Sequence, residues 1–197
     1  RLIAASGPDL APQALVEAFT HRSARLLAPE TIDEALEGAG DAPTQIERLL
    51  AMEDNLVGAA NKNKLAGYVR NRLNSQGSQS WFIRGPGQPF ERLARLAALQ
   101  RRCDAGTFDA KDKAELSAAF DAMGLAVLEE TRVFDRITKS GRPVLDQAAA
   151  LLKLSVQGLL PSGRCTAQAQ DLVGQLLGSE DGRTEAADPG AAPTLPP

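Results

Sequence analysis

The sequence predicts an all-α protein: an up-and-down bundle of six or seven helices, followed by a disordered C-terminal tail. Ala and Leu supply most of the apolar side chains of the 197 residues, and aromatic residues make up only 4%, which favours helices over sheets. Apolar residues recur at helical spacing, and short connections that contain Pro or Gly separate these segments, which implies antiparallel neighbours. No internal repeat of fixed period is visible, and this argues against a solenoid.

Residues 1–178 are expected to form one helical domain. A first helix carries Leu15, Phe19 and Leu26 at helical spacing. Pro29 ends this helix and suits the first turn of a short second helix, because proline lacks the amide that a helix interior needs.

A third helix begins near Pro43 and either breaks at Gly58 or continues through it as far as Leu73. A glycine inside a helix costs about 1 kcal/mol relative to alanine, so a kink at Gly58 is expected if the helix continues.

The polar stretch 74–80 is expected to be a connection, and 81–90 an irregular loop, because Gly85-Pro-Gly and Pro89 disfavour regular structure. The next helix is expected to begin at Pro89 or Phe90 and to end near Cys103.

The clearest helical signal lies in residues 109–139. Its seam follows alternating spacings of four and three residues: Leu116, Phe120, Met123, Val127, Glu130, Phe134 and Ile137. This heptad-like pattern predicts one helix of about 30 residues, roughly 45 Å long. We expect the seam to form the core of the monomer; a homodimer through helix 109–139 is the alternative.

A Leu-rich helix follows Pro143, and a last helix carries Leu172, Val173 and Leu176. Residues 179–197 are rich in Gly, Pro, Ala and acids. Such a composition buries too little apolar surface to offset the entropy of ordering, so this segment is expected to be disordered.

Charge is distributed unevenly along the chain, although the formal net charge is only −3. Segment 61–102 carries nine basic residues and one acid, and it also holds the only Trp and the only Tyr, whereas both flanks are acidic. The predicted partner-binding residues are Lys62, Lys64, Arg70, Arg72, Trp81, Phe82, Arg84, Arg92, Arg95 and Arg102. Among them, Arg92, Arg95 and Arg102 fall within about 80° of each other on a helix and are expected to form one basic stripe.

Two alternatives apply to this basic segment. It presents an anion-binding surface, or acids elsewhere in the fold neutralise it; the acidic clusters at 33–37 and 129–130 are the candidates for that role. In the same way, Trp81 and Phe82 are either core residues or exposed anchors of an interface.

Catalytic and metal-binding patterns are missing from the sequence. His21 is the only histidine, and no Gly-x-x-x-x-Gly-Lys loop occurs. Cys103 and Cys165 lie far apart without CxxC spacing, so we expect two small buried hydrophobic side chains and no zinc site; a disulfide between them is the alternative. The sequence therefore predicts no enzyme, no cofactor and no metal.

Taken together, these patterns predict a cytoplasmic, non-enzymatic interaction or regulatory domain of adaptor type, which binds an acidic protein partner through the basic surface of residues 61–102. The alternative is nucleic-acid or anionic-surface binding through the same helices, with an affinity that falls steeply with salt. No run approaches the roughly 18 consecutive apolar residues of a membrane span, and no secretory signal pattern is seen.

Overall fold

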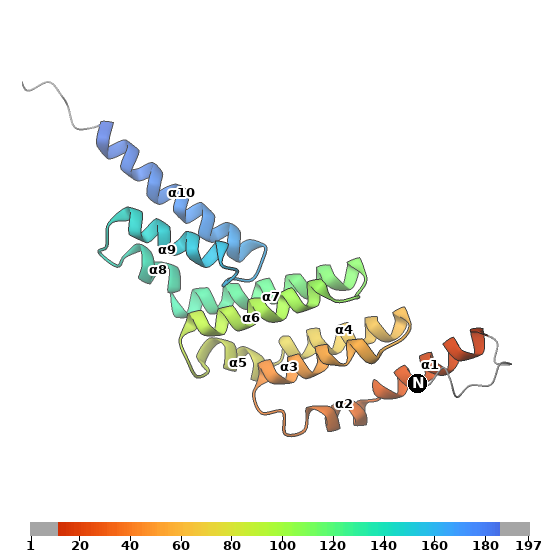
Figure 1. Cartoon of the computed structure of the whole chain (residues 1–197). Helices are drawn as coiled ribbons and strands as arrows, with labels where there is room; N and C mark the ends of the chain where they lie inside the picture. Colours follow the sequence, from red (N-terminus) through yellow and green to blue (C-terminus); the bar gives the residue numbers. More distant parts are fainter. Residues whose placement is uncertain (1–11, 186–197) are drawn as a thin grey trace, which may run out of the picture.

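The computed structural model describes residues 12–185, which form ten α-helices and one short 3₁₀ helix, with no strand in this part of the chain (Figure 1). The predicted all-α class is confirmed, but the number of helices exceeds the six or seven expected. The elements are α1 (Pro12–Leu26), α2 (Pro29–Leu36), α3 (Ala42–Ala51), η2 (Glu53–Asn55), α4 (Ala59–Leu73), α5 (Gln76–Arg84), α6 (Pro89–Ala105), α7 (Ala110–Thr131), α8 (Val133–Thr138), α9 (Val144–Val156) and α10 (Arg164–Glu185).

Three helical hairpins, α3–α4, α6–α7 and α9–α10, form the body of the molecule (Figure 1). Within each hairpin the two helices are antiparallel, because the connection between them is short. Between the first two hairpins, equivalent helices lie side by side, α3 with α6 and α4 with α7, and α4 and α7 run in the same direction. Lys62 near the start of α4 donates to Thr107 just before α7, and Arg70 further along α4 pairs with Glu115 further along α7. The bundle is therefore a stack of hairpins.

The third hairpin joins the stack through α7. Asp121, in the middle of α7, accepts hydrogen bonds from Arg164 and Cys165 at the start of α10. Gly124, one turn further along α7, lies against Pro161 and Cys165, where it leaves no room for a side chain. Figure 1 shows α8 beside α9, and α1 and α2 at the opposite end of the stack.

One continuous cluster of buried residues runs through the molecule, from Leu27 after α1 to Val173 in α10. Phe82 in α5 and Phe120 in α7 are among its largest fully buried side chains. Trp81 is half-buried and meets Phe82 edge-on, with the ring centroids 5.1 Å apart. Phe82 is therefore a core residue, which excludes its predicted alternative role as an exposed anchor.

The predicted single helix 109–139 is wrong, because the chain breaks it at Arg132. This residue adopts the left-handed conformation with φ of 50°, so α7 ends at Thr131 and α8 begins at Val133. The apolar seam nevertheless lies largely in the core of the monomer, as expected: Leu116, Phe120, Met123, Val127 and Phe134 are all buried. Helix 109–139 therefore offers no apolar seam for the alternative homodimer.

The predicted connection 74–80 and the first part of the predicted loop are also wrong, since residues 76–84 form helix α5. Ser75 caps this helix by accepting from the backbone N–H of Ser78, and the Ser78 hydroxyl donates to the carbonyl of Arg72 at 2.6 Å. These polar side chains satisfy the backbone groups of two adjoining helix ends, which composition alone does not reveal. Of the two outcomes expected at Gly58, the break is observed, with φ of 93°. The preceding helix is shorter than expected, however, because α3 ends at Ala51 and the 3₁₀ helix η2 follows it.

Helix α10 continues to Glu185, beyond position 178 where the tail was expected to begin. The disorder expected for the remaining residues, 186–197, lies outside the described part of the chain. Within the described residues, no helix combines the length and the apolar composition needed to cross a lipid bilayer.

Candidate functional site

Arg92 lies inside the molecule, with only 6% of its surface exposed. Its guanidinium donates four hydrogen bonds to backbone carbonyls: Nε to Phe82 at 2.8 Å, Nη2 to Ile83 at 3.0 Å, and Nη1 to Gly85 and Gly87 at 2.7 Å each. Arg92 therefore supplies hydrogen-bond donors to the backbone carbonyls at the C-terminal end of α5 and in the loop that follows it. It is not available to an external partner.

Arg95 joins three helices of the same region. Its Nη1 lies 3.1 Å from Asp41 Oδ2 and its Nε lies 3.6 Å from Glu47 Oε1, while the guanidinium stacks 5.4 Å from the ring centroid of Trp81. Burial raises the pKa of Asp41, but hydrogen bonds from Thr44 and the charge and hydrogen bond of Arg95 outweigh this effect and hold that pKa below its usual value. The charge of Arg95 is thus neutralised inside the fold.

Two further basic residues of the predicted surface have internal partners. Arg70 pairs with Glu115, and Lys62 donates to the hydroxyl of Thr107. The acids that neutralise this segment are therefore Asp41, Glu47 and Glu115. No ion pair found within the described residues uses the acidic clusters 33–37 and 129–130 that the sequence suggested.

The remaining predicted residues lie apart from one another. Lys64 is exposed, with its ammonium 6.0 Å from the ring centroid of Tyr68. Arg72 lines a groove beside α2. Arg84 precedes the start of α6 and Arg102 lies in its last turn, so the length of the helix, roughly 20 Å, separates them. The structure therefore does not bring the predicted residues together into one basic surface.

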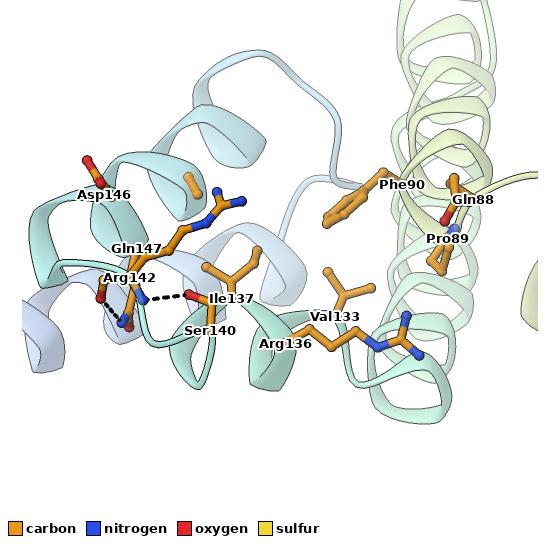
Figure 2. Close-up of a pocket in the computed structure, with 11 residues that line it drawn as sticks. Gln88, Pro89, Phe90, Val133, Arg136, Ile137, Ser140, Arg142, Asp146 and Gln147 are labelled. Atoms are coloured by element: carbon orange, nitrogen blue, oxygen red, sulfur yellow. Dashed lines mark hydrogen bonds between the residues drawn. The ribbon is translucent and has the colours of Figure 1, made fainter.

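A different site is present between the start of α6, α8 and the start of α9, where a pocket of about 330 Å³ opens (Figure 2). Phe90, Val133 and Ile137 line it with apolar surface, and Arg136 and Arg142 add two guanidinium groups. We call it the α6–α8–α9 pocket. Its size and its apolar lining with a few polar groups are typical of sites that bind small ligands or single side chains.

Both arginines of the α6–α8–α9 pocket are exposed, and none of the ion pairs found within the described residues involves them. Figure 2 shows the side chain of Arg142 and the ring of Phe90 pointing into the space above Ile137. Asp146 lies at the α9 side of the pocket and is the one acid that lines it. The two guanidinium groups therefore leave the lining with a net positive charge.

Gln147 adds a buried acceptor to the same lining. Its Nε2 donates to the carbonyl of Arg142 at 2.7 Å, whereas its Oε1 is buried without a hydrogen-bond partner. An oxygen buried in this way has no surface open to a ligand in the pocket, so it is not part of the binding chemistry. The pocket thus combines an apolar wall with two cations.

The sequence contains a second cluster of basic residues that indicates this site, but the larger number of basic residues in segment 61–102 drew the prediction to that segment. Between positions 132 and 142 lie Arg132, Arg136, Lys139 and Arg142, with Asp135 as the only acid. Lys139 pairs with Asp135 at 3.3 Å. At 100° per residue these four basic residues would fall within about 120° of one another on a single long helix. The chain instead breaks at Arg132, and Arg136 and Arg142 line the pocket next to the start of α6.

The two cysteines are free and buried, as predicted. Burial raises the pKa of Cys103 to about 12, and the charges of Asp104 and Glu53 act in the same direction. Burial and the neighbouring Asp121 also raise the pKa of Cys165. Neither thiol therefore has the thiolate character of a nucleophile. Among the described residues, no group of three His, Cys, Asp or Glu side chains is placed to hold a metal ion.

Comparisons of the chain with models of protein families, with curated proteins and with solved structures find no match. The function therefore has to be inferred from the geometry and the chemistry of the site.

Proposed function

We propose that the protein is a non-enzymatic interaction domain of adaptor type, which binds an acidic segment of a protein partner in the α6–α8–α9 pocket. The observation that carries this proposal is an apolar pocket flanked by Arg136 and Arg142, two exposed cations for which the described residues supply no ion pair. The acidic partner is the class that the sequence predicted, but the binding surface moves from residues 61–102 to α8 and α9.

The chemistry of the lining favours a peptide. An apolar side chain would pack against Phe90 and Ile137, and a neighbouring carboxylate would pair with a guanidinium group, which binds carboxylates through two parallel hydrogen bonds. Together the apolar wall and the guanidinium groups match an acidic residue close to an apolar one.

The proposal includes a cytoplasmic location for the protein. Two buried free thiols are typical of proteins kept in a reducing environment, which supports a cytoplasmic location. An adaptor in this compartment would act by bringing a bound partner to another component, and this regulatory role follows from the peptide site rather than from any catalytic group.

The experiment is a selection from a random peptide library with three forms of the full chain: wild type, Arg136→Glu/Arg142→Glu, and Arg84→Glu/Arg102→Glu as the control. The control reverses two exposed arginines outside the pocket. We expect the wild type and the control to enrich peptides with an acid next to an apolar residue. For an enriched peptide, the pocket variant is expected to lose at least tenfold in affinity.

Three results would overturn the proposal: no enriched sequence, enrichment that the pocket variant retains, or enrichment that the control variant loses. The alternative of nucleic-acid binding is measured in parallel with a labelled duplex. If the duplex binds with a steep salt dependence while peptides do not, phosphate binding replaces the peptide site as the function of these cations.

A further inference from the structure

Helix α9 is apolar on two opposite faces. Its inner face, with Ala148, Leu151 and Leu154, is buried in the core. The outer face carries a second row of apolar residues, which we call the outer stripe: Leu145, Ala149, Leu152 and Val156. Of these, Leu145 is 64% exposed, Leu152 42% and Val156 81%. A single exposed apolar side chain is normal, but a contiguous row of them marks an interaction surface.

The outer stripe has the spacing of a helix–helix interface. Its residues follow one another at intervals of four, three and four, and they fall within about 60° of the helix surface at about 100° per residue. The seam of helix α7 has the same kind of spacing, but that seam is buried inside the monomer. In α9 the row remains exposed along the length of the helix.

The outer stripe is complementary to itself about a two-fold axis. If a second α9 packs antiparallel, with the axis between Ala149 and Leu152, then Leu145 of each copy meets Val156 of the other. In the same arrangement Ala149 meets Leu152, so a small side chain faces a large one and the helices can approach closely. This is the residue pattern of an isologous dimer interface.

The charges beside the stripe select the antiparallel orientation. Asp146 and Lys153 lie on the same flank of α9, about two turns apart. Antiparallel pairing places Asp146 of each copy near Lys153 of the other, whereas parallel pairing puts this flank of the two copies on opposite sides of the interface, so that the two residues gain no partner. Neither residue takes part in the ion pairs found within the described residues.

We propose that the outer stripe of α9 is a homodimer interface, in which α9 packs antiparallel against α9 of a second copy of this chain. A helix of 13 residues is only about 20 Å long. A contact of that length buries less than the roughly 1,200–2,000 Å² of a stable standard interface. The dimer is therefore weak, with a dissociation constant in the micromolar range, and it forms and separates with protein concentration.

The first experiment is sedimentation equilibrium of the full chain over a hundredfold range of concentration, with wild type, Leu152→Glu and Val57→Glu. Val57 is 39% exposed and lies far from α9 in the sequence, which makes it a matched control for Leu152. We expect a monomer–dimer equilibrium for the wild type and for Val57→Glu, and a dissociation constant at least tenfold higher for Leu152→Glu. A wild type that stays monomeric at all concentrations, or a dimer that Leu152→Glu leaves intact, overturns the proposal.

A charge exchange tests the orientation without adding a charge to the apolar stripe. Asp146→Lys alone and Lys153→Asp alone should each weaken the dimer, because each places like charges together. An equimolar mixture of the two single variants should restore it, and so should the double variant in one chain. Circular dichroism shows whether each variant remains folded. If the mixture stays as weak as the separate variants, the antiparallel pairing is wrong.

Disulfide cross-linking provides an independent test of the register. In the antiparallel dimer the two copies of Val156 are about 16 Å apart along the helix axis. The single variant Val156→Cys should therefore not cross-link, whereas Leu145→Cys/Val156→Cys should. Efficient cross-linking of Val156→Cys alone would demonstrate a parallel pair and contradict the proposal. The native cysteines do not interfere, since both are buried.

Discussion

Arg92 shows how one side chain can complete the end of a helix. The last turn of any helix leaves carbonyl groups without amide partners. In α5 the carbonyls of Phe82 and Ile83 receive their hydrogen bonds from Arg92, and so do those of Gly85 and Gly87 in the loop. The positive charge also lies at the negative end of the helix dipole, which stabilises it without an acidic partner.

Replacing Arg92 by methionine leaves these four carbonyls without donors, and Arg92→Lys restores only some of the hydrogen bonds. We expect Arg92→Met to lower the free energy of unfolding by about 3 kcal/mol, and Arg92→Lys by less. The control is Arg102→Met on the same helix, an exposed residue whose change should stay within about 0.5 kcal/mol. Urea unfolding measures all three; equal effects at the two positions would contradict the assigned role.

Asp121 acts in the interior of the molecule at the junction of α7 and α10. Its Oδ1 accepts from the backbone N–H of Cys165 at 3.0 Å and its Oδ2 from Nε of Arg164 at 3.1 Å. Burial raises the pKa of this carboxyl, but the hydrogen bonds from Cys165 and Arg164 outweigh burial and hold the pKa below the usual value of 3.8. The ionised form is therefore the one that stabilises the fold.

The lowered pKa of Asp121 determines how the free energy of unfolding depends on pH. Because the pKa of Asp121 is lower in the folded state than in the unfolded state, its contribution is fully present above about pH 4 and is lost as the pH falls further. We expect Asp121→Asn to lower the free energy of unfolding by about 2 kcal/mol at pH 7. The difference from wild type should shrink below pH 4. Urea titrations between pH 3 and 7 test this, with the exposed Asp171→Asn in α10 as the control; a difference that does not change with pH would contradict it.

The sequence shows which residues are charged, but it does not show their partners. Arg95 pairs with an acid 54 positions away, and Arg70 with one 45 positions away. Such pairs exist only after the helices have packed, so acidic clusters close to a basic segment in sequence are no guide to them. The same limit explains why Arg92, Arg95 and Arg102 share a helix face in projection and yet occupy three different environments.

At the scale of the elements, the apolar periodicity predicted most of the helices and missed their interruptions. The seam of 109–139 stays in phase across the break at Arg132, so a pattern of apolar residues does not reveal it. Helix α5 was missed for the opposite reason: Ser75 and Ser78 satisfy backbone groups at its start, but a polar stretch resembles a connection. Both errors arise where local backbone chemistry decides the boundary of a helix.

Gly124 and Gly174 test how closely the elements pack. A Cβ atom on Gly124 would lie 2.7 Å from Cγ of Pro161 and 2.8 Å from Sγ of Cys165, whereas one on Gly174 would meet no atom within 4 Å. Alanine is favoured over glycine in a helix by about 1 kcal/mol, so Gly174→Ala should stabilise the protein by up to that amount. Gly124→Ala should instead destabilise it by about 1–3 kcal/mol, because α7 and α10 must move apart.

Thermal unfolding followed by circular dichroism distinguishes the two glycine variants. A change of 1 kcal/mol shifts the Tm of a chain of this size by about 2–4 °C. The two variants should therefore shift the Tm in opposite directions. An increase for both would show that α7 and α10 are not in close contact at Gly124.

At the scale of the whole molecule, the all-α class followed from composition and spacing, and the arrangement of the hairpins did not. Equivalent helices of α3–α4 and α6–α7 run side by side in the same direction, which depends on pairings such as Arg70 with Glu115. No repeated motif marks these hairpins in the sequence, so their stacking could not be read from it. The α6–α8–α9 pocket, which lies where two layers of the stack meet, was hidden for the same reason.

A stack of this kind need not unfold as one unit, since each layer contacts only its neighbours. Hairpin α9–α10 lies at one end and α6–α7 in the middle (Figure 1). Each contains one buried thiol: Cys165 in α10 and Cys103 in α6. We expect Cys165 to become accessible through opening of the end hairpin alone, and Cys103 only through unfolding of the central layers.

Labelling with a thiol reagent in rising urea, on Cys103→Ala and Cys165→Ala, measures the two openings separately. The opening that exposes Cys165 should have the smaller free energy and the smaller dependence on urea, because it exposes less surface. Substituting each cysteine by alanine leaves a small cavity, so both variants are first compared with wild type in equilibrium unfolding. If the two thiols react with the same free energy and the same urea dependence, the hairpins unfold cooperatively, and the core that connects them from Leu27 to Val173 outweighs the layered arrangement.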